Sequence, residues 1–142
     1  MKTVVLAAAL VSAAAVAQSS TWLTVVGDPG NAAVDTVEVD ATSAVAFESM
    51  RLVKLRVNRA MVRDAFDGKP FRSYYSTAMV DCKENKAWHR SISLFSNPLW
   101  QGQMRMHEYA ESDGRSLAFA EMADNPRDRL IKAACAISLQ EK

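Results

Sequence analysis

Two histidines are the residues of this chain best suited to general acid–base chemistry. His89 lies in an expected strand, and His107 is followed directly by Glu108. Neighbouring residues of a strand point to opposite faces, so Glu108 would not orient the His107 imidazole. Neither histidine lies in a G-x-S-x-G or H-E-x-x-H sequence, the settings that present a nucleophile or bind zinc. We therefore expect both imidazoles to be solvent-facing or hydrogen-bonded rather than catalytic.

Paired carboxylates are the other route to acid–base catalysis. Most acidic residues fall at expected turns, where Asp bonds the local backbone, whereas Asp81 ends a strand and would cap a turn or pair with an arginine. With 5 glycines and no phosphate-cradling pattern, nothing points to a nucleotide or redox cofactor. We expect no enzymatic activity, no cofactor and no metal site. The carboxylates that could form such an acid–base pair, judged by residue type alone, are Asp35, Asp40, Asp64, Asp67, Asp81, Glu108, Glu111 and Asp113.

The first 17 residues have the composition of a cleaved secretory signal. Lys2 supplies one positive charge, residues 3–16 are uncharged and mainly apolar, and Ala15-Val16-Ala17 ends the run. A basic start, an apolar segment of about 7–15 residues and an A-x-A end are typical of such signals. The run is shorter than the roughly 20 residues that a membrane helix needs. We expect cleavage after Ala17, no membrane insertion afterwards, and a periplasmic, secreted or surface-associated product; a buried N-terminal helix is the alternative.

Cys82 and Cys135 are the two cysteines of the chain. In an oxidising compartment two thiols usually pair, and the bridge would close a loop of about 54 residues. A metal site would need further ligands, and Cys82 has no C-x-x-C partner. We expect a structural disulfide, with a metal site or a reactive thiol as the alternatives.

Composition favours one ordinary globular domain after the signal, over residues 18–142. The chain has 142 residues, of which 49% are hydrophobic and 23% charged, with a formal net charge of +1. Removal of Lys2 with the signal leaves 16 basic residues (17 minus 1) and 16 acidic ones. This balance argues against intrinsic disorder and against a nucleic-acid-binding protein, which usually carries a strong basic excess.

Short alternating segments predict a mainly β domain. In residues 50–59, Val53, Leu55 and Val57 alternate with polar residues, which is typical of an antiparallel strand with one solvated face. Residues 60–70 read as a connection and 83–86 as a hairpin tip. Residues 117–122 read as a strand or an extended segment. The other expected strands are residues 21–26, 36–39, 44–47, 71–82, 87–95 and 104–109.

Two further expectations concern the second half of the chain. In residues 87–95, period two would place Trp88, Arg90, Ile92 and Leu94 on one face. A helix is expected over residues 129–139, because Asp124-Asn125-Pro126 offers an N-cap and a proline in the first turn. Its apolar residues at helical spacing are Leu130, Ala133, Ala134 and Ile137.

A basic cluster lies on or near the strand at residues 50–59. With further arginines it would form a positive sheet face that binds an acidic polysaccharide or an acidic protein segment; the alternative is a solvated face balanced by acids. Trp100, in a proline-containing loop, is either an exposed binding anchor or a lid over the edge of the core. The candidate binding surface is Arg51, Lys54, Arg56 and Trp100, and the further members of the positive face are Arg59, Arg63, Arg72 and Arg90.

The chain contains, in order, Trp22, Val37-Glu38-Val39-Asp40, residues 51–58, 69–73, Val80-Asp81-Cys82, 97–102, and Pro126 to Cys135. This order of segments resembles the surface-adhesin protein E-like family of Gram-negative bacteria. The resemblance implies an α+β fold, an antiparallel sheet of about six strands with a C-terminal helix packed on one face, and a Cys82–Cys135 bridge. The family's named member is a lipoprotein that binds host matrix and serum proteins and can dimerise. This signal lacks the lipobox cysteine, and no binding residue is carried over.

From residues and resemblance together, we expect an exported, non-enzymatic, adhesin-like domain. Its partner would be a protein or polysaccharide of the host matrix or of the envelope, with a homodimer possible and no nucleic acid involved. One alternative is a small periplasmic hydrolase using scattered carboxylates or His107. Another is an inhibitor or chaperone-like module using an open strand edge.

Overall fold

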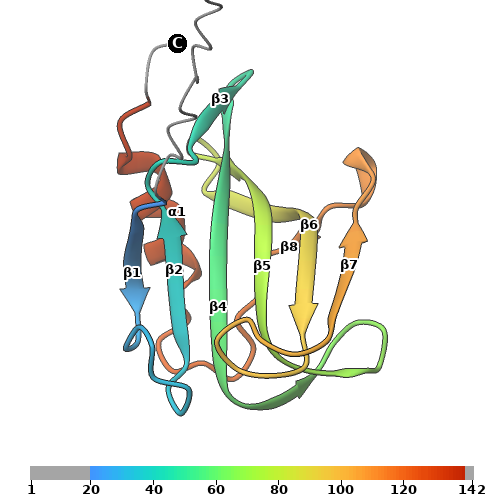
Figure 1. Ribbon diagram of the computed structural model, residues 1–142. Helices are drawn as coiled ribbons and strands as arrows, with labels where there is room; N and C mark the ends of the chain where they lie inside the picture. Colours follow the sequence, from blue (N-terminus) through green and yellow to red (C-terminus); the bar gives the residue numbers. More distant parts are fainter. Residues whose placement is uncertain (1–19, 140–142) are drawn as a thin grey trace, which may run out of the picture.

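One antiparallel sheet forms the frame of the molecule (Figure 1). In this computed structural model, residues 20–139 are described; the expected signal, residues 1–17, lies outside them. Six strands follow one another across the sheet in the order β1-β2-β4-β5-β6-β7, while β3 pairs with β4 and β8 with β6. The strands are β1 (Trp22–Val26), β2 (Thr36–Asp40), β3 (Val45–Phe47), β4 (Met50–Asp64), β5 (Pro70–Asp81), β6 (Lys86–Phe95), β7 (Met104–Glu108) and β8 (Arg115–Ser116).

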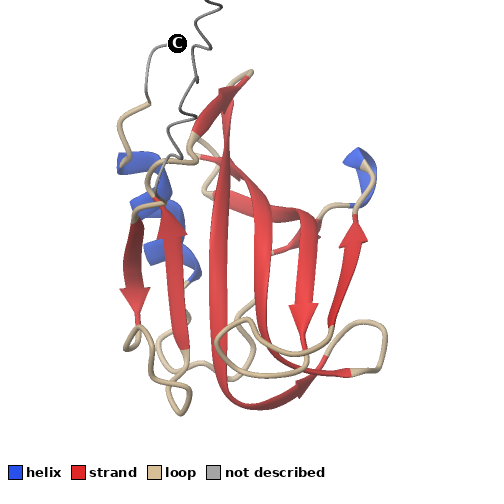
Figure 2. Ribbon diagram, viewed as in Figure 1, coloured by secondary structure: helices blue, strands red, loops and turns tan. Residues whose placement is uncertain are grey.

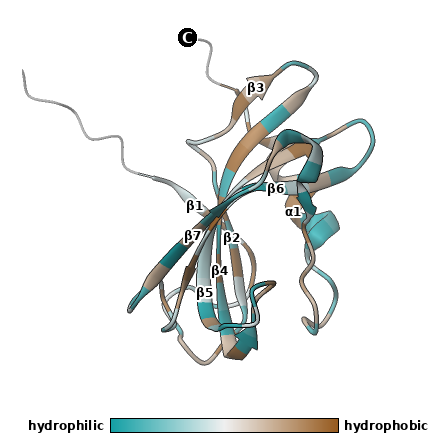
Figure 3. Ribbon diagram, turned by 90° about the vertical axis from the view of Figure 1, so that its right-hand side faces the viewer, coloured by the Kyte–Doolittle hydropathy of each residue, from teal (hydrophilic) through white to brown (hydrophobic). Residues whose placement is uncertain are grey.

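The sheet has an inner face and an open face. The inner face is covered by α1 (Arg127–Ala136), which contacts β1, β2, β4 and β5, and by the segment that follows β8 (Figures 2 and 3). Val53, Leu55 and Val57 of β4 lie on this face with no exposed area, as their alternation predicted. The α+β architecture, with an antiparallel sheet and one C-terminal helix, is therefore confirmed. The rest of the core includes Val37, Val39, Ala78, Val80, Ile92, Leu94, Leu117, Phe119, Leu130, Ile131 and Ala134.

Strand β4 is longer than the sequence pattern predicted. It was expected to end at Arg59, but pairing with β5 resumes at Arg63 and Asp64 after an irregularity that begins at Asn58. The amide of Ala60 donates to Oδ1 of Asp35 at 2.7 Å, so a side chain supplies an acceptor where the ladder is broken. The irregularity removes the period-two pattern, which is why the extension reads as a connection.

A bulge in β6 overturns the expected face assignment of that strand. Thr77 pairs with Ser91 but Ala78 pairs with His89, so Arg90 is the extra residue. Because the bulge adds one residue to β6, the residues before it lie on the opposite face from the one that unbroken alternation predicts. His89 therefore shares the inner face with Ile92 and Leu94, and Trp88 does not.

The C-terminal segment differs from its expected bounds. Helix α1 spans Arg127–Ala136 rather than 129–139, because Ile137 is already extended with ψ 127°. Asn125 Oδ1 accepts from the Arg127 amide at 3.2 Å, in the turn that leads into the helix. Of the segment expected at 117–122, none is in a strand; pairing with β6 stops at Ser116.

The expected disulfide is present. Cys82 and Cys135 are joined across a Cα–Cα distance of 5.9 Å and a sequence separation of 53. Cys82 directly follows β5, and Cys135 lies in the last turn of α1. The bridge therefore fixes the helix to the inner side of the sheet. No helix within residues 20–139 has the length and apolar character that crossing a bilayer requires.

Candidate binding face

An arginine stacked between two tryptophans occupies the open face of the sheet. The Arg56 guanidinium carbon lies 4.3 Å from the Trp22 ring centroid and 4.3 Å from the Trp100 ring centroid. Its Nε and Nη2 donate to the two carboxylate oxygens of Glu38 at 2.7 and 3.0 Å. Glu38 is 2% exposed, so this is a largely buried two-point ion pair. The pair neutralises Arg56 and holds its plane in position against both rings.

Strand register brings these side chains together. Glu38 of β2 is opposite Arg56 of β4, Arg56 is opposite Tyr75 of β5, and Tyr75 is opposite Ser93 of β6. Directly opposed residues of an antiparallel sheet share a face, so this row crosses four strands on one side. The neighbouring row places Lys54, Thr77 and Ser91 beside it in the same way.

Tyr75 extends the aromatic surface. Its ring centroid lies 6.1 Å from that of Trp22, 5.5 Å from that of Trp100 and 5.8 Å from that of Phe95. These are distances at which aromatic rings attract each other. Tyr75 is 36% exposed, so the patch is open to solvent rather than sealed in the core. We call Trp22, Arg56, Tyr75 and Trp100 the aromatic stack.

Trp100 is fixed by the loop that carries it. Its amide donates to Ser73 Oγ at 2.9 Å, and its indole Nε1 donates to the Tyr74 carbonyl at 3.2 Å. Leu99 and Trp100 both have left-handed backbone, with φ of 55° and 59°, and the Leu99 amide donates to Asn58 Oδ1 at 2.9 Å. The loop thus holds the partly exposed Trp100 ring over Arg56 of β4 and beside Tyr75 of β5, on the open face of the sheet.

A groove of about 390 Å³ lies beside the aromatic stack. Trp22 and Tyr75 border it, and the hydroxyls of Thr77, Ser91 and Ser93 line it. Its charged side chains are the exposed Lys54 and the buried carboxylate of Asp40, which already accepts from Thr42. The groove therefore offers ring faces, hydroxyls and one available ammonium group.

The four residues expected to form one binding surface divide between the two faces. Lys54, Arg56 and Trp100 come together on the open face. Arg51 does not, because it is two residues from Val53 and therefore shares the inner face, toward the helix. There its Nη1 donates to the carbonyls of Ala134 at 2.9 Å and Ile137 at 2.6 Å.

The larger positive face does not form either. Arg59 Nη2 donates to the Ala120 carbonyl at 2.8 Å on the inner side. Arg72 donates to the carbonyls of Arg59 and Ala32 at 3.0 and 3.1 Å. These arginines hold the backbone of neighbouring segments, and Arg56 is neutralised by Glu38. The open face is thus aromatic and mixed in charge rather than strongly basic.

Two members of the aromatic stack were not among the predicted site residues. Trp22 was noted as a feature of the resemblance, and Tyr75 lies within the strand expected at residues 71–82. Trp22 and Tyr75 lie close to Arg56 because β1 pairs with β2 and β4 pairs with β5. Sequence periodicity gives the face of each strand but not the register between strands, so the signal was incomplete.

One histidine is hydrogen-bonded and the other is exposed to solvent, the two settings expected from the sequence. His89 is 8% exposed and its Nδ1 shares a hydrogen bond of 2.6 Å with Ser76 Oγ. Burial lowers the pKa of His89 to about 4, so the imidazole is neutral at pH 7. His107 is exposed, with its ring 4.8 Å from Phe66 and 4.5 Å from Tyr109.

Within residues 20–139 neither histidine forms an ion pair with a carboxylate, as an oriented base would. Among the described residues, His107 lines neither the groove beside the aromatic stack nor the cavity of about 560 Å³ on the inner face, which His89 does line. In the same described part of the chain, no three His, Cys, Asp or Glu side chains are grouped so as to hold a metal ion.

Comparison with known proteins gives one match. The family model for surface-adhesin protein E matches residues 22–136, a range that includes every strand, α1 and both cysteines. No curated protein and no solved structure matches the chain. The family description suggests a surface-adhesin-like, non-enzymatic role, and together with the disulfide it is consistent with an exported protein. Since the match spans most of its length, the chain belongs to the surface-adhesin protein E family.

Proposed function

We propose that the protein is an exported, non-enzymatic, adhesin-like domain that binds a partner macromolecule through the open face of its sheet. The partner would be a component of the host matrix or of the bacterial envelope. The observation that carries the proposal is the aromatic stack, which sits on the face that α1 does not cover. Family membership supports an adhesin-like role independently of the geometry.

The aromatic stack has the properties of a binding hot spot. Trp, Tyr and Arg are the residue types that contribute most to macromolecular interfaces when they are packed in place. Here the rings and the guanidinium are already ordered by the Glu38 pair and by the loop contacts of Trp100. Little side-chain entropy would be lost on binding, because the surface is pre-organised.

The charge of the face predicts a moderate dependence on salt. Arg56 is neutralised by Glu38, which leaves Lys54 as the available cation of the groove. Aromatic and hydroxyl contacts are not screened by ions, whereas binding through a polycationic surface weakens steeply as salt is added. The proposed mode is therefore recognition by rings and hydrogen bonds, with one charge contributing.

Binding to immobilised matrix and envelope components tests the proposal. The mature protein should bind at least one component at micromolar concentration, and Lys54→Glu should weaken that binding about tenfold or more. Lys132→Glu makes the same charge change on the exposed side of α1 and should leave binding unaltered. Absence of any binding, or equal effects of the two variants, would contradict the proposal.

A further inference from the structure

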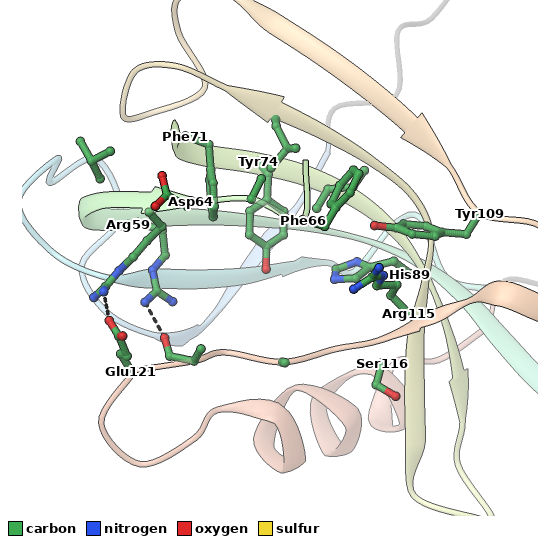
Figure 4. A pocket seen from close by; sticks show the side chains of 17 residues that line it. Arg59, Asp64, Phe66, Phe71, Tyr74, His89, Tyr109, Arg115, Ser116 and Glu121 are labelled. Carbon is green, nitrogen blue, oxygen red and sulfur yellow. Dashed lines mark hydrogen bonds and ion pairs between the residues drawn. The ribbon is translucent and has the colours of Figure 1, made fainter. Parts of the chain in front are cut away.

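A second cavity lies on the inner face of the sheet, away from the aromatic stack. Its volume is about 560 Å³, within the range of roughly 300–1,000 Å³ typical of small-molecule sites. It is bounded by the far part of β4, by β5 and β6, and by the segment 115–121 that crosses the inner face (Figure 4). We call it the inner cavity.

One end of the inner cavity is cationic. Arg59 and Arg63 both line it, and Arg59 is 4% exposed. The Nε groups of both arginines are buried and form no hydrogen bond within the described residues, although the Arg59 Nε lies 3.5 Å from Asp35 Oδ1. A buried donor without an acceptor costs free energy, so this end of the cavity suits an anionic acceptor.

Acidic partners of these arginines lie at the margin. Glu121 pairs with Arg63 but its side chain is 67% exposed, and Asp35 contacts Arg59 at 3.5 Å without lining the cavity. Asp64, also at the lining, is exposed. Burial and the neighbouring charge of Arg63 lower the pKa of Arg59, although Asp35 acts in the opposite direction. The described carboxylates therefore leave the Arg63 Nε without a hydrogen bond, and Asp35 approaches the Arg59 Nε only to 3.5 Å.

The middle of the inner cavity is apolar. Phe66, Phe71, Ile92 and Leu94 contribute to its walls. The Tyr74 ring lies among them with its hydroxyl directed into the cavity (Figure 4). Burial raises the pKa of Tyr74, so its hydroxyl remains protonated and can donate a hydrogen bond.

We infer that the inner cavity binds an amphipathic carboxylate, a single apolar chain that ends in one carboxylate group. The planar carboxylate matches the planar guanidinium edges of Arg59 and Arg63, and the Tyr74 hydroxyl is placed to donate to it. The chain would lie along Phe71, Ile92 and Leu94. This site is independent of the open face, so either one can fail experimentally without the other.

Dodecanoate is the probe that tests this inference, measured by isothermal titration calorimetry below its micelle concentration. It should bind at micromolar concentration. Dodecanol has the same chain without the charge, and dodecyltrimethylammonium has the opposite charge. Each should bind at least about tenfold more weakly, since neither offers the two guanidinium groups a charged acceptor with two oxygens. Equal binding of dodecanol and dodecanoate, or no binding of dodecanoate, would overturn the inference.

Two substitutions with opposite expected effects sharpen the test. Arg63→Gln should weaken dodecanoate binding about tenfold or more, and Glu121→Gln should strengthen it several-fold because it removes a competing carboxylate from Arg63. Arg129→Gln is the matched control, since that side chain is 52% exposed on α1 and does not line the cavity. Should Arg63→Gln fail to fold, the exposed Glu121→Gln and the head-group series decide; unchanged or weaker binding by Glu121→Gln counts against the site.

Discussion

Arg51 and Arg56 belong to the same strand yet have different structural roles. Arg51 points to the inner face and donates to two carbonyls at the end of α1, whereas Arg56 points to the open face and pairs with Glu38. Their positions differ by five, an odd number, so the two side chains point to opposite faces of the sheet. A shift of one residue along the strand thus decides whether an arginine supports the fold or belongs to the proposed binding surface.

Arg51→Met should destabilise the protein by about 2 kcal/mol. The substitution keeps most of the side-chain volume but removes two charge-assisted hydrogen bonds to the carbonyls of Ala134 and Ile137. Urea unfolding followed by circular dichroism measures the effect. Arg129→Met, an exposed position on α1, should change the unfolding free energy by less than about 0.5 kcal/mol. Similar values for the two variants would show that Arg51 does not stabilise the helix end.

His89 should make stability depend on pH in the acid range. Its pKa is lowered from 6.5 to about 4 in the folded protein, so between these values the unfolded chain binds more protons. Stability therefore falls as pH decreases from about 6.5 to 4, and His89 contributes a loss of up to about 3 kcal/mol. The difference in unfolding free energy between the wild type and His89→Gln should shrink over this interval. Carboxylate effects cancel in that difference, so parallel curves would contradict the assignment.

Regular strands are predicted from the sequence better than irregular ones. The strand at residues 50–59 is predicted well because Val53, Leu55 and Val57 alternate with polar residues without interruption. The extension of β4 to Asp64 and the bulge at Arg90 are not, because each breaks the period on which the prediction depends. The open-face cluster was predicted only in part, since the contact of Tyr75 with Trp22 requires the register of separate strands.

The disulfide should account for a large part of the stability of α1 on the sheet. The bridge between β5 and α1 closes a loop of 53 residues in sequence separation, for which the loop-entropy estimate is about 4 kcal/mol. The double variant Cys82→Ser/Cys135→Ser should therefore unfold at a much lower urea concentration. Wild type should match it once a reductant is added, whereas the variant should not respond. A midpoint shared by oxidised and reduced wild type would show that the bridge adds nothing.

The two faces of the sheet carry different groups and have different proposed roles. The inner face holds the core, the helix and a cavity with a cationic end. The open face holds rings and hydroxyls that the fold itself does not cover. The bridge and Arg51 fix α1 to the inner face, which leaves the open face available to a partner.

The dissociation constant of the partner complex, measured for Tyr75→Ala and Tyr109→Ala, tests this division most directly. Both variants remove a partly exposed tyrosine ring, but Tyr75 belongs to the aromatic stack and Tyr109 lines the inner cavity. Tyr75→Ala should weaken binding to a captured matrix or envelope component by about tenfold or more, and Tyr109→Ala should change it by less than about twofold. Loss of binding in Tyr109→Ala with retention in Tyr75→Ala would contradict this division.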